Sequence, residues 1–262
     1  MSGCVTLEHA GAVARVTLQH DGKMNAMSRA MWRELKAVFD AVAKADDLRC
    51  VIVSGAGGHF CAGGDIAEYP TFRFDEATLR DFHETDVWGA LGAMLACDLP
   101  LLAQIQGNCM GAGVEIASCC DIRVAGTSAK FGAPIARLGF PMAPRELQLV
   151  VGAAGLATAR EMLLEAAVLD AQAMAARGFL NAVVADEALQ ADVQRRAQRM
   201  VTLAPQAACL NKQMLRALQA PAGEAAGGLA MEARVQVAYA YADSAEHREG
   251  IAAFLDKRKP DF

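Results

Sequence analysis

The chain has no long unbroken apolar run and no N-terminal segment of the secretory type. Its most apolar stretch, residues 99–120, still contains Glu115, a proline, three amide side chains and three glycines, so it is too polar to cross a bilayer. The first residues carry no basic segment ahead of an apolar one, so we expect no signal peptide and no association with a membrane. We therefore expect a cytoplasmic protein.

The sequence also lacks an excess of positive charge. It has 25 Lys and Arg residues against 30 Asp and Glu residues, a net charge of −5, whereas a protein that binds nucleic acid needs a basic face. We therefore expect no nucleic-acid partner. The one basic cluster is residues 257–259, where Lys257 and Lys259 are either solvated or available to a phosphate group.

None of the eight cysteines forms a C-x-x-C pair, and the adjacent Cys119 and Cys120 lie in an apolar stretch. Zinc sites and disulfide frameworks use paired spacings, whereas a free cysteine behaves as a small hydrophobic residue. We therefore expect reduced, buried thiols and no metal. The five histidines are scattered, and His83-Glu84 lacks the second histidine of a zinc protease motif, so we expect ordinary solvated histidines.

Motifs for nucleotide binding and for nucleophilic catalysis are missing as well. Neither glycine-rich segment follows G-x-G-x-x-G, no G-K-[ST] sequence occurs, and there is no G-x-S-x-G elbow. The chain is instead rich in apolar residues, at 54% of the sequence, with 23 glycines and only 8 prolines. This composition excludes a disordered or collagen-like chain and is sufficient for a sizeable core in one large domain or two smaller ones.

Strand-like and helix-like segments alternate in the first part of the chain, and helix-like segments dominate the rest. Ser28, for example, is a typical N-cap for a helix whose apolar residues recur at helical spacing. The pattern predicts an α/β core over residues 1–195 and a helical module over residues 196–262. The expected strands are residues 12–18, 50–53, 101–105, 122–125 and 183–184, and the expected helices are residues 28–45, 75–96, 154–164, 170–176, 187–203, 205–220, 224–242 and 244–255.

Two glycine-rich loops, residues 55–64 and 107–113, each follow an expected buried strand and precede a helix-like segment. Backbone N–H groups at such junctions have no partner within the helix and are available to an anion. Either loop alone is equally well explained as a tight turn. Two of them brought together would offer two donors to one oxygen, which is an oxyanion hole.

Glu115 stands immediately after the second loop and is the one charge between Asp98 and Asp121. Its neighbours in the sequence are apolar, which favours burial over exposure on an amphipathic helix. A buried carboxyl beside an oxyanion hole is the minimal apparatus for moving a proton next to a carbonyl group.

These motifs resemble those of a known superfamily. Residues 60–66 (FCAGGDI) and 107–122 (GNCMGAGVEIASCCDI) are similar to the paired signatures of the crotonase, or enoyl-CoA hydratase/isomerase, superfamily. The similarity extends over essentially the whole chain. It includes residues 23–27 (KMNAM), which resemble an early coenzyme A loop, residues 131–134 (FGAP), residues 138–139 (LG) and residues 249–260 (EGIAAFLDKRKP).

The resemblance implies a spiral of ββα units with a helical C-terminal region that forms trimers or dimers of trimers. It implies an acyl-CoA substrate, a thioester enolate and no metal or redox cofactor. It places the oxyanion donors at the backbone N–H groups of Gly64 and Ala112 and a catalytic carboxyl at Glu115. The thioester contacts that it implies are Met24, Ala26, Ala62, Gly64, Asp65, Ile66, Ala67, Gly111, Ala112 and Ile135.

One position departs from the pattern of the hydratases. They carry a second glutamate directly after the proline of Phe-Gly-x-Pro, where this chain has Ile135. Residues 139–146 also lack the usual Pro-Gly-x-Gly-Gly run, and we expect Glu146 to be an exposed residue at a helix start. The leading prediction is hydratase/isomerase-like chemistry with Glu115 alone. An acyl-CoA decarboxylase and a non-catalytic acyl-CoA-binding protein remain open.

Overall fold

The computed structural model describes residues 2–218, 235–236 and 238–262. Contacts divide the chain into one unit that ends at Ala197 and a second that runs from Gln198 to Phe262. The pocket described below is lined entirely by residues of the first unit. None of the described helices is long and apolar enough to span a membrane.

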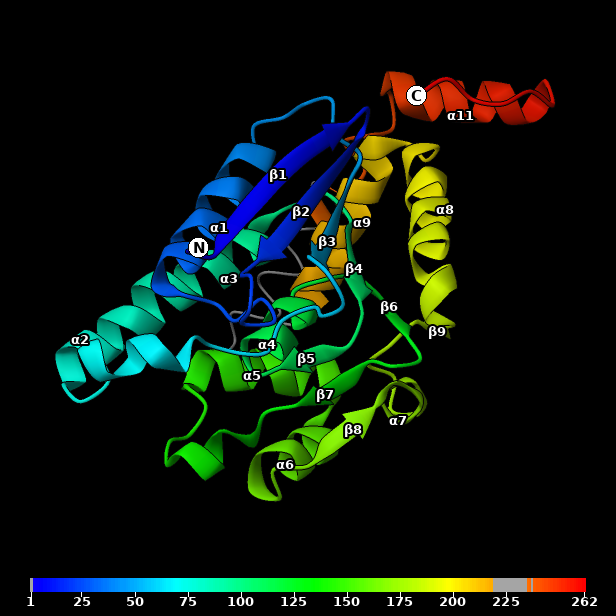
Figure 1. Cartoon of the computed structure of the whole chain (residues 1–262). Coiled ribbons are helices and arrows are strands. Elements are labelled where there is room, and N and C mark those ends of the chain that lie inside the picture. The colour runs from blue at the N-terminus through cyan, green and yellow to red at the C-terminus, as the bar shows by residue number, and fades with distance from the viewer. Residues whose placement is uncertain (1, 219–234, 237) are drawn as a thin grey trace. The chain divides into compact units, whose positions relative to one another are not determined.

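A six-stranded sheet forms the centre of the first unit, with strand order β1-β2-β3-β4-β6-β9 (Figure 1). The pair β1–β2 is antiparallel and the other pairs are parallel. All five strands expected from the sequence are present, and β1 was missed because it is an edge strand with three exposed residues at its end. The strands are β1 (Cys4–Ala10), β2 (Val13–Gln19), β3 (Cys50–Gly55), β4 (Leu101–Ile105), β6 (Ile122–Gly126) and β9 (Ala182–Val184).

A second, three-stranded sheet has the order β5-β7-β8, with β5 parallel to β7 and β8 antiparallel to it. Its strands are three residues long, too short to show alternation in the sequence. Together with the large sheet it builds ββα units, of which β4, β5 and α4 are one. The elements of this layer are β5 (Asn108–Met110), β7 (Lys130–Gly132), β8 (Val168–Asp170) and the helix α4 (Ala112–Ser118).

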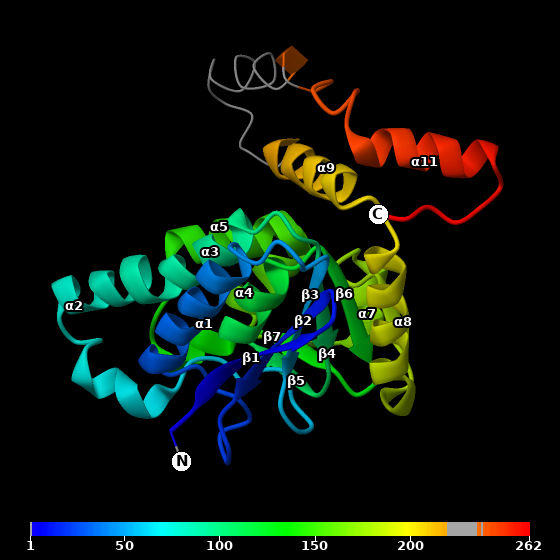
Figure 2. The same ribbon diagram turned by 90° about the horizontal axis from the view of Figure 1, so that it is seen from above.

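Helix α1 (Arg29–Val42) begins where its cap predicts, because the Ser28 side chain accepts a hydrogen bond from the Met31 N–H at 3.2 Å. Its apolar face is buried, and the helix packs against β1 and α3 (Figure 2). The expected helix over residues 75–96 is present in three consecutive parts. These are α2 (Glu76–Asp81), a π-helical segment η2 (Phe82–Val87) and α3 (Trp88–Ala96).

The remaining helices of the first unit lie between strands in the chain order or after the last of them. They are η1 (Ile66–Thr71), η3 (Pro134–Leu138), α5 (Pro144–Ala154), α6 (Leu156–Leu164), α7 (Ala171–Ala176), η4 (Asp186–Ala188) and α8 (Leu189–Val201), the last of which contains the division between the units. Helix α5 and the short helices η1, η3 and η4 were not among the expected helices, whereas α6, α7 and α8 lie within two residues of expectation.

The second unit contains α9 (Pro205–Leu218) and α11 (Ala245–Leu255). Ser244 caps α11 as predicted and accepts from the His247 N–H at 3.2 Å. Residues 219–220 of one expected helix, and residues 224–234 and 237 of the next, lie outside the described residues.

Candidate active site

The two glycine-rich loops lie against each other. An isolated parallel bridge joins Cys61 to Cys109, with the Met110 N–H donating to the Cys61 carbonyl at 2.9 Å and the Cys61 N–H donating to the Asn108 carbonyl at 2.9 Å. The structure therefore brings together segments that are almost fifty residues apart in the chain. The backbones meet so closely that a Cβ on Gly113 would lie 2.7 Å from the Cys61 carbonyl oxygen.

Glycine is required at the turn into α4. Gly111 has φ 47° and ψ −111°, a backbone conformation that side chains other than hydrogen disfavour. The next residue, Ala112, opens α4, so its N–H points out of the helix. Within the described part of the chain, neither the Ala112 N–H nor the Gly64 N–H donates to a protein acceptor.

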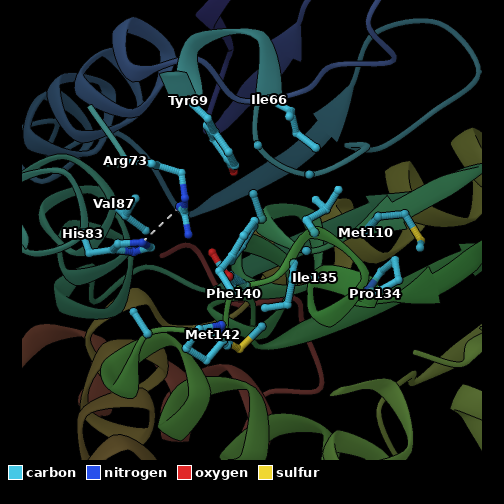
Figure 3. Close-up of a pocket in the computed structure, with 18 of the residues that line it drawn as sticks. Ile66, Tyr69, Arg73, His83, Val87, Met110, Pro134, Ile135, Phe140 and Met142 are labelled. Atoms are coloured by element: carbon cyan, nitrogen blue, oxygen red, sulfur yellow. Dashed lines mark hydrogen bonds between the residues drawn. The ribbon is translucent and has the colours of Figure 1, made fainter. Parts of the chain in front are cut away.

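A cavity of about 310 Å³ opens at this junction, and Figure 3 shows most of its walls. The lining is mainly apolar, with one carboxyl, that of Glu115, among the described residues. Of the ten predicted thioester contacts, six line the cavity. They are Ala62, Gly64, Ile66, Gly111, Ala112 and Ile135.

The other four predicted contacts do not line this cavity. Ala26 is buried, its N–H donates to the Lys23 carbonyl, and its own carbonyl lies 2.7 Å from Nδ1 of His20. Asp65 is buried in an ion pair with Lys23 at 2.6 Å, and it also caps η1. Met24 and Ala67 are exposed.

Glu115 lies partly exposed in the cavity wall, in the first turn of α4. Burial and, to a smaller extent, the nearby Glu146 carboxylate together raise the pKa of its carboxyl to about 8. Glu115 is therefore largely protonated at neutral pH.

Glu146 is not the exposed residue that we expected at a helix start. It does lie in the first turn of α5, but its side chain is buried and its carboxylate oxygen lies 2.9 Å from Nδ1 of His83. The prediction that His83 and His20 are solvated is also wrong, because His83 lines the cavity and His20 is buried. The π-helical segment η2 carries His83 into the cavity wall, and the sequence showed no signal for it.

Two other groups in the wall were not predicted. The hydroxyl of Tyr69 lies so close to Gly64 that a Cβ on that residue would collide with it. Burial raises the pKa of Tyr69 to about 12, so the hydroxyl is protonated at neutral pH. The Arg73 guanidinium lies over the rings of Phe140 and Tyr69, with Cζ–centroid distances of 3.8 and 4.6 Å.

The raised pKa of Glu115 predicts a pH-dependent stability. Between the ordinary value near 4.5 and the folded value near 8, the unfolded chain releases a proton that the folded chain keeps, so stability falls as the pH rises through this window. Glu115→Gln removes the effect, and we expect its Tm to exceed that of the unmodified protein at pH 9 and the difference to shrink towards pH 5. Glu84→Gln, at an exposed carboxylate, is the control. Parallel Tm curves for Glu115→Gln and the unmodified protein would contradict the prediction.

The described residues contain no group of three or more His, Cys, Asp or Glu side chains arranged to hold a metal ion. All eight cysteines lie in the described part of the chain, and six of them are buried.

Comparison with known proteins places this geometry in a family. The family model for enoyl-CoA hydratase/isomerase matches residues 8–262. The 2,3-dehydroadipyl-CoA hydratase of Escherichia coli (strain K12) is 32% identical over 250 residues, which cover 95% of this chain and 94% of that protein. A probable enoyl-CoA hydratase of Mycobacterium bovis is 30% identical over 260 residues, with coverage of 98% and 97%.

Solved structures agree. The crystal structure of an enoyl-CoA hydratase/carnithine racemase from Magnetospirillum magneticum is 37% identical, covers 98% of this chain and 94% of its own, and superposes with a TM-score of 0.92. This similarity confirms the crotonase-like α/β fold expected from the sequence motifs. The chain belongs to the enoyl-CoA hydratase/isomerase family.

Proposed function

We propose that this enzyme moves a proton next to the carbonyl group of enoyl-CoA thioesters and that the reaction passes through a thioester enolate. One observation carries the proposal. A single cavity is lined by the Glu115 carboxyl and by Gly64 and Ala112, whose backbone N–H groups have no protein acceptor in the described part of the chain. A carboxyl and two free donors are the groups that enolate chemistry requires.

In this proposal the N–H groups of Gly64 and Ala112 hold the thioester oxygen as it gains negative charge. The bridge between Cys61 and Cys109 holds the two loops in place before substrate binds, so little reorganisation is needed. Because the enolate charge is stabilised by backbone donors, the proposed steps require no metal or redox cofactor. Ala62, Ile66 and Gly111 line the path of the thioester in the same cavity.

Glu115 acts as the acid and base. In a 3-enoyl thioester, its carboxylate removes a proton from C2, and the electron pair of that C–H bond moves to the thioester oxygen to give a dienolate. Return of the proton to C4 forms the 2-enoyl product and regenerates the carboxylate. With a pKa near 8, Glu115 can both take and return this proton close to neutral pH.

Isomerisation needs one acid/base group, whereas hydration also needs a group that holds and activates water. Ile135 presents an apolar side chain in the cavity where hydratases of this superfamily carry their second glutamate. We therefore propose isomerisation as the efficient reaction and expect hydration to be weak.

Hydration is the second candidate because of one observation in the structure. The buried Glu146 carboxylate is close enough to Glu115 to raise its pKa, so a second carboxyl does lie near the cavity. The relatives named as hydratases support the same candidate. Neither a decarboxylase nor a non-catalytic binding protein is favoured by these names.

The test is an assay of the unmodified protein with 3-hexenoyl-CoA and crotonyl-CoA at equal enzyme concentration. We expect conversion of 3-hexenoyl-CoA to the 2-enoyl thioester and little hydration of crotonyl-CoA. Efficient hydration would instead assign the second acid to Glu146. Conversion of neither thioester would contradict the proposed function.

Ile135→Glu is expected to increase crotonyl-CoA hydration. The substitution restores a carboxyl at the position where the superfamily carries one, and general acid–base assistance is typically worth about 10²–10⁴ in rate. We expect a gain of about 10-fold or more, because the new carboxyl lacks an optimised environment. Ile135→Gln has a similar shape without an ionisable group and is the matched control. An equal effect of both substitutions would show that polarity alone, and not a carboxyl, is responsible.

We also propose that the protein forms a trimer or a dimer of trimers. Several large apolar side chains of the second unit are exposed, among them Leu215, Phe254 and Leu255, and such surfaces are typical of interfaces. Exposed Lys257 and Lys259 follow α11 and are available to coenzyme A phosphates in such an assembly. Light scattering at micromolar concentration should give at least three times the chain mass of 27.6 kDa. A monomer mass would contradict the proposal.

A further inference from the structure

Arg73 is a cation in the cavity wall without an anionic partner. Within the described part of the chain its guanidinium forms no ion pair and donates to no oxygen atom, and the one polar contact of that group is Nε2 of His83 at 3.5 Å from Nη1. The other guanidinium in the lining, that of Arg137, is exposed and donates to the Ala166 carbonyl. A half-buried guanidinium has five N–H donors, so most of those of Arg73 are unused.

The surroundings of Arg73 hold the guanidinium in a fixed position. Its Cζ lies over the rings of Phe140 and Tyr69, and these two rings contact each other edge to face with centroids 5.9 Å apart and an interplanar angle of 68°. His83 fixes one edge of the group and is itself held by the buried Glu146 carboxylate at 2.9 Å. The contacts with the rings and with His83 leave most of the N–H donors unpaired, and their planar arrangement suits bidentate binding of a carboxylate.

Arg73 lies towards the closed end of the cavity. Figure 3 shows Arg73, His83 and Val87 together on one wall, with Met110 and Pro134 on the opposite side. Phe82 and Val87 line the cavity near His83 and are buried. Ile66 and Leu138 are exposed and mark the open side. A thioester that enters from the open side and is held at Gly64 and Ala112 therefore directs its acyl chain, and not its coenzyme A phosphates, towards Arg73.

We infer that Arg73 binds a carboxylate at the far end of the acyl chain, so that the cavity selects coenzyme A thioesters of dicarboxylic acids. The inference rests on the proposed function, because that function places the thioester carbonyl at Gly64 and Ala112. The apolar lining surrounds the methylene groups of the chain, and the single guanidinium pairs with its charged end. A methyl-ended chain leaves the cation half-buried and unpaired, which disfavours its binding.

The experiment compares two saturated thioesters of equal length, adipyl-CoA and hexanoyl-CoA, by calorimetric titration. Neither has a double bond, so their binding is measured whether or not the protein turns over enoyl thioesters. We expect the unmodified protein to bind adipyl-CoA about 10- to 100-fold more tightly, the value of a hydrogen bond to a charged group. Arg73→Met should abolish this preference by weakening adipyl-CoA alone, and Arg73→Lys should retain part of it.

Arg80→Met is the matched control, because Arg80 is exposed on α2 and pairs with Glu76 outside the cavity. It should leave both affinities unchanged. Equal weakening of both thioesters by Arg73→Met would overturn the inference and assign Arg73 to a coenzyme A phosphate. If Arg73→Met does not fold, the unmodified protein still decides, since equal affinity for the two thioesters would overturn the inference.

Discussion

Glu115→Gln is expected to lower the isomerisation kcat by about 10²–10⁴, the usual value of a positioned acid or base. Glutamine keeps the shape of the side chain and its hydrogen-bonding capacity but cannot take a proton from C2. The carboxyl does not contact the thioester oxygen in the proposed mechanism, so KM and the affinity for a saturated acyl-CoA should change little. The measurement is steady-state conversion of 3-hexenoyl-CoA together with titration of hexanoyl-CoA.

Glu146→Gln separates this role from a general effect of charge near the cavity. The Glu146 carboxylate raises the pKa of Glu115. In Glu146→Gln, the increase of kcat/KM with pH, which follows deprotonation of Glu115, should therefore occur below about pH 8. The maximal rate should be retained if Glu115 alone is the acid/base group. A loss in Glu146→Gln as large as that in Glu115→Gln would instead place Glu146 in the chemistry. Full activity of Glu115→Gln would contradict the assignment of Glu115.

The parts of the site that the sequence predicted are those that leave a local signature. A strand-to-helix turn with a close backbone approach requires glycine, and Gly111 and Gly113 are therefore visible in the sequence as a motif. The position of Glu115, a single charge in an apolar segment, is equally local. These features also lie in the segments with the most specific family motifs, so the resemblance and the residue-level reasoning agree there.

The parts that were missed depend on contacts between distant segments. The pair of His83 and Glu146 joins a π-helical segment to α5, and the two residues are 63 positions apart in the chain, so no local pattern shows that they meet. The position of Arg73 also depends on a distant segment. One of the two rings that its guanidinium contacts is that of Phe140, which belongs to residues 139–146, the segment that departs from the family pattern. The helix-like sequence pattern therefore predicted that η2 is helical. It did not predict that the π-helical geometry of this segment directs His83 into a cavity.

The fold shows the same division. The buried strand β4 was predicted to the residue because four of its five residues are apolar. The strands of the small sheet pair over three residues each, and their positions are determined by tertiary contacts and not by their own sequence. This sheet nevertheless matters for function, since β5 leads directly into the turn at Gly111.

Ala112→Pro is expected to lower kcat by about 10²–10³, as for the loss of one oxyanion donor. Proline removes the Ala112 N–H and nothing else of consequence at this position. Ala112 is the first residue of α4, where proline is well tolerated because its N–H has no helical partner. The preceding Gly111, which is free of a side chain, accommodates the proline ring. The N–H of Gly64 remains, so activity should fall without disappearing.

Leu156→Pro is the matched control for this substitution. Leu156 opens α6, also follows a glycine with positive φ, and lies outside the cavity. It should retain the rate of the unmodified protein, which separates loss of a donor from the effect of proline at a helix start. Circular dichroism and Tm establish that both variants fold. An unchanged kcat in folded Ala112→Pro would show that the Ala112 N–H does not hold the thioester oxygen. The enolate would then need a different donor, and the protonated Tyr69 hydroxyl, which lies beside Gly64 in the cavity wall, is a candidate.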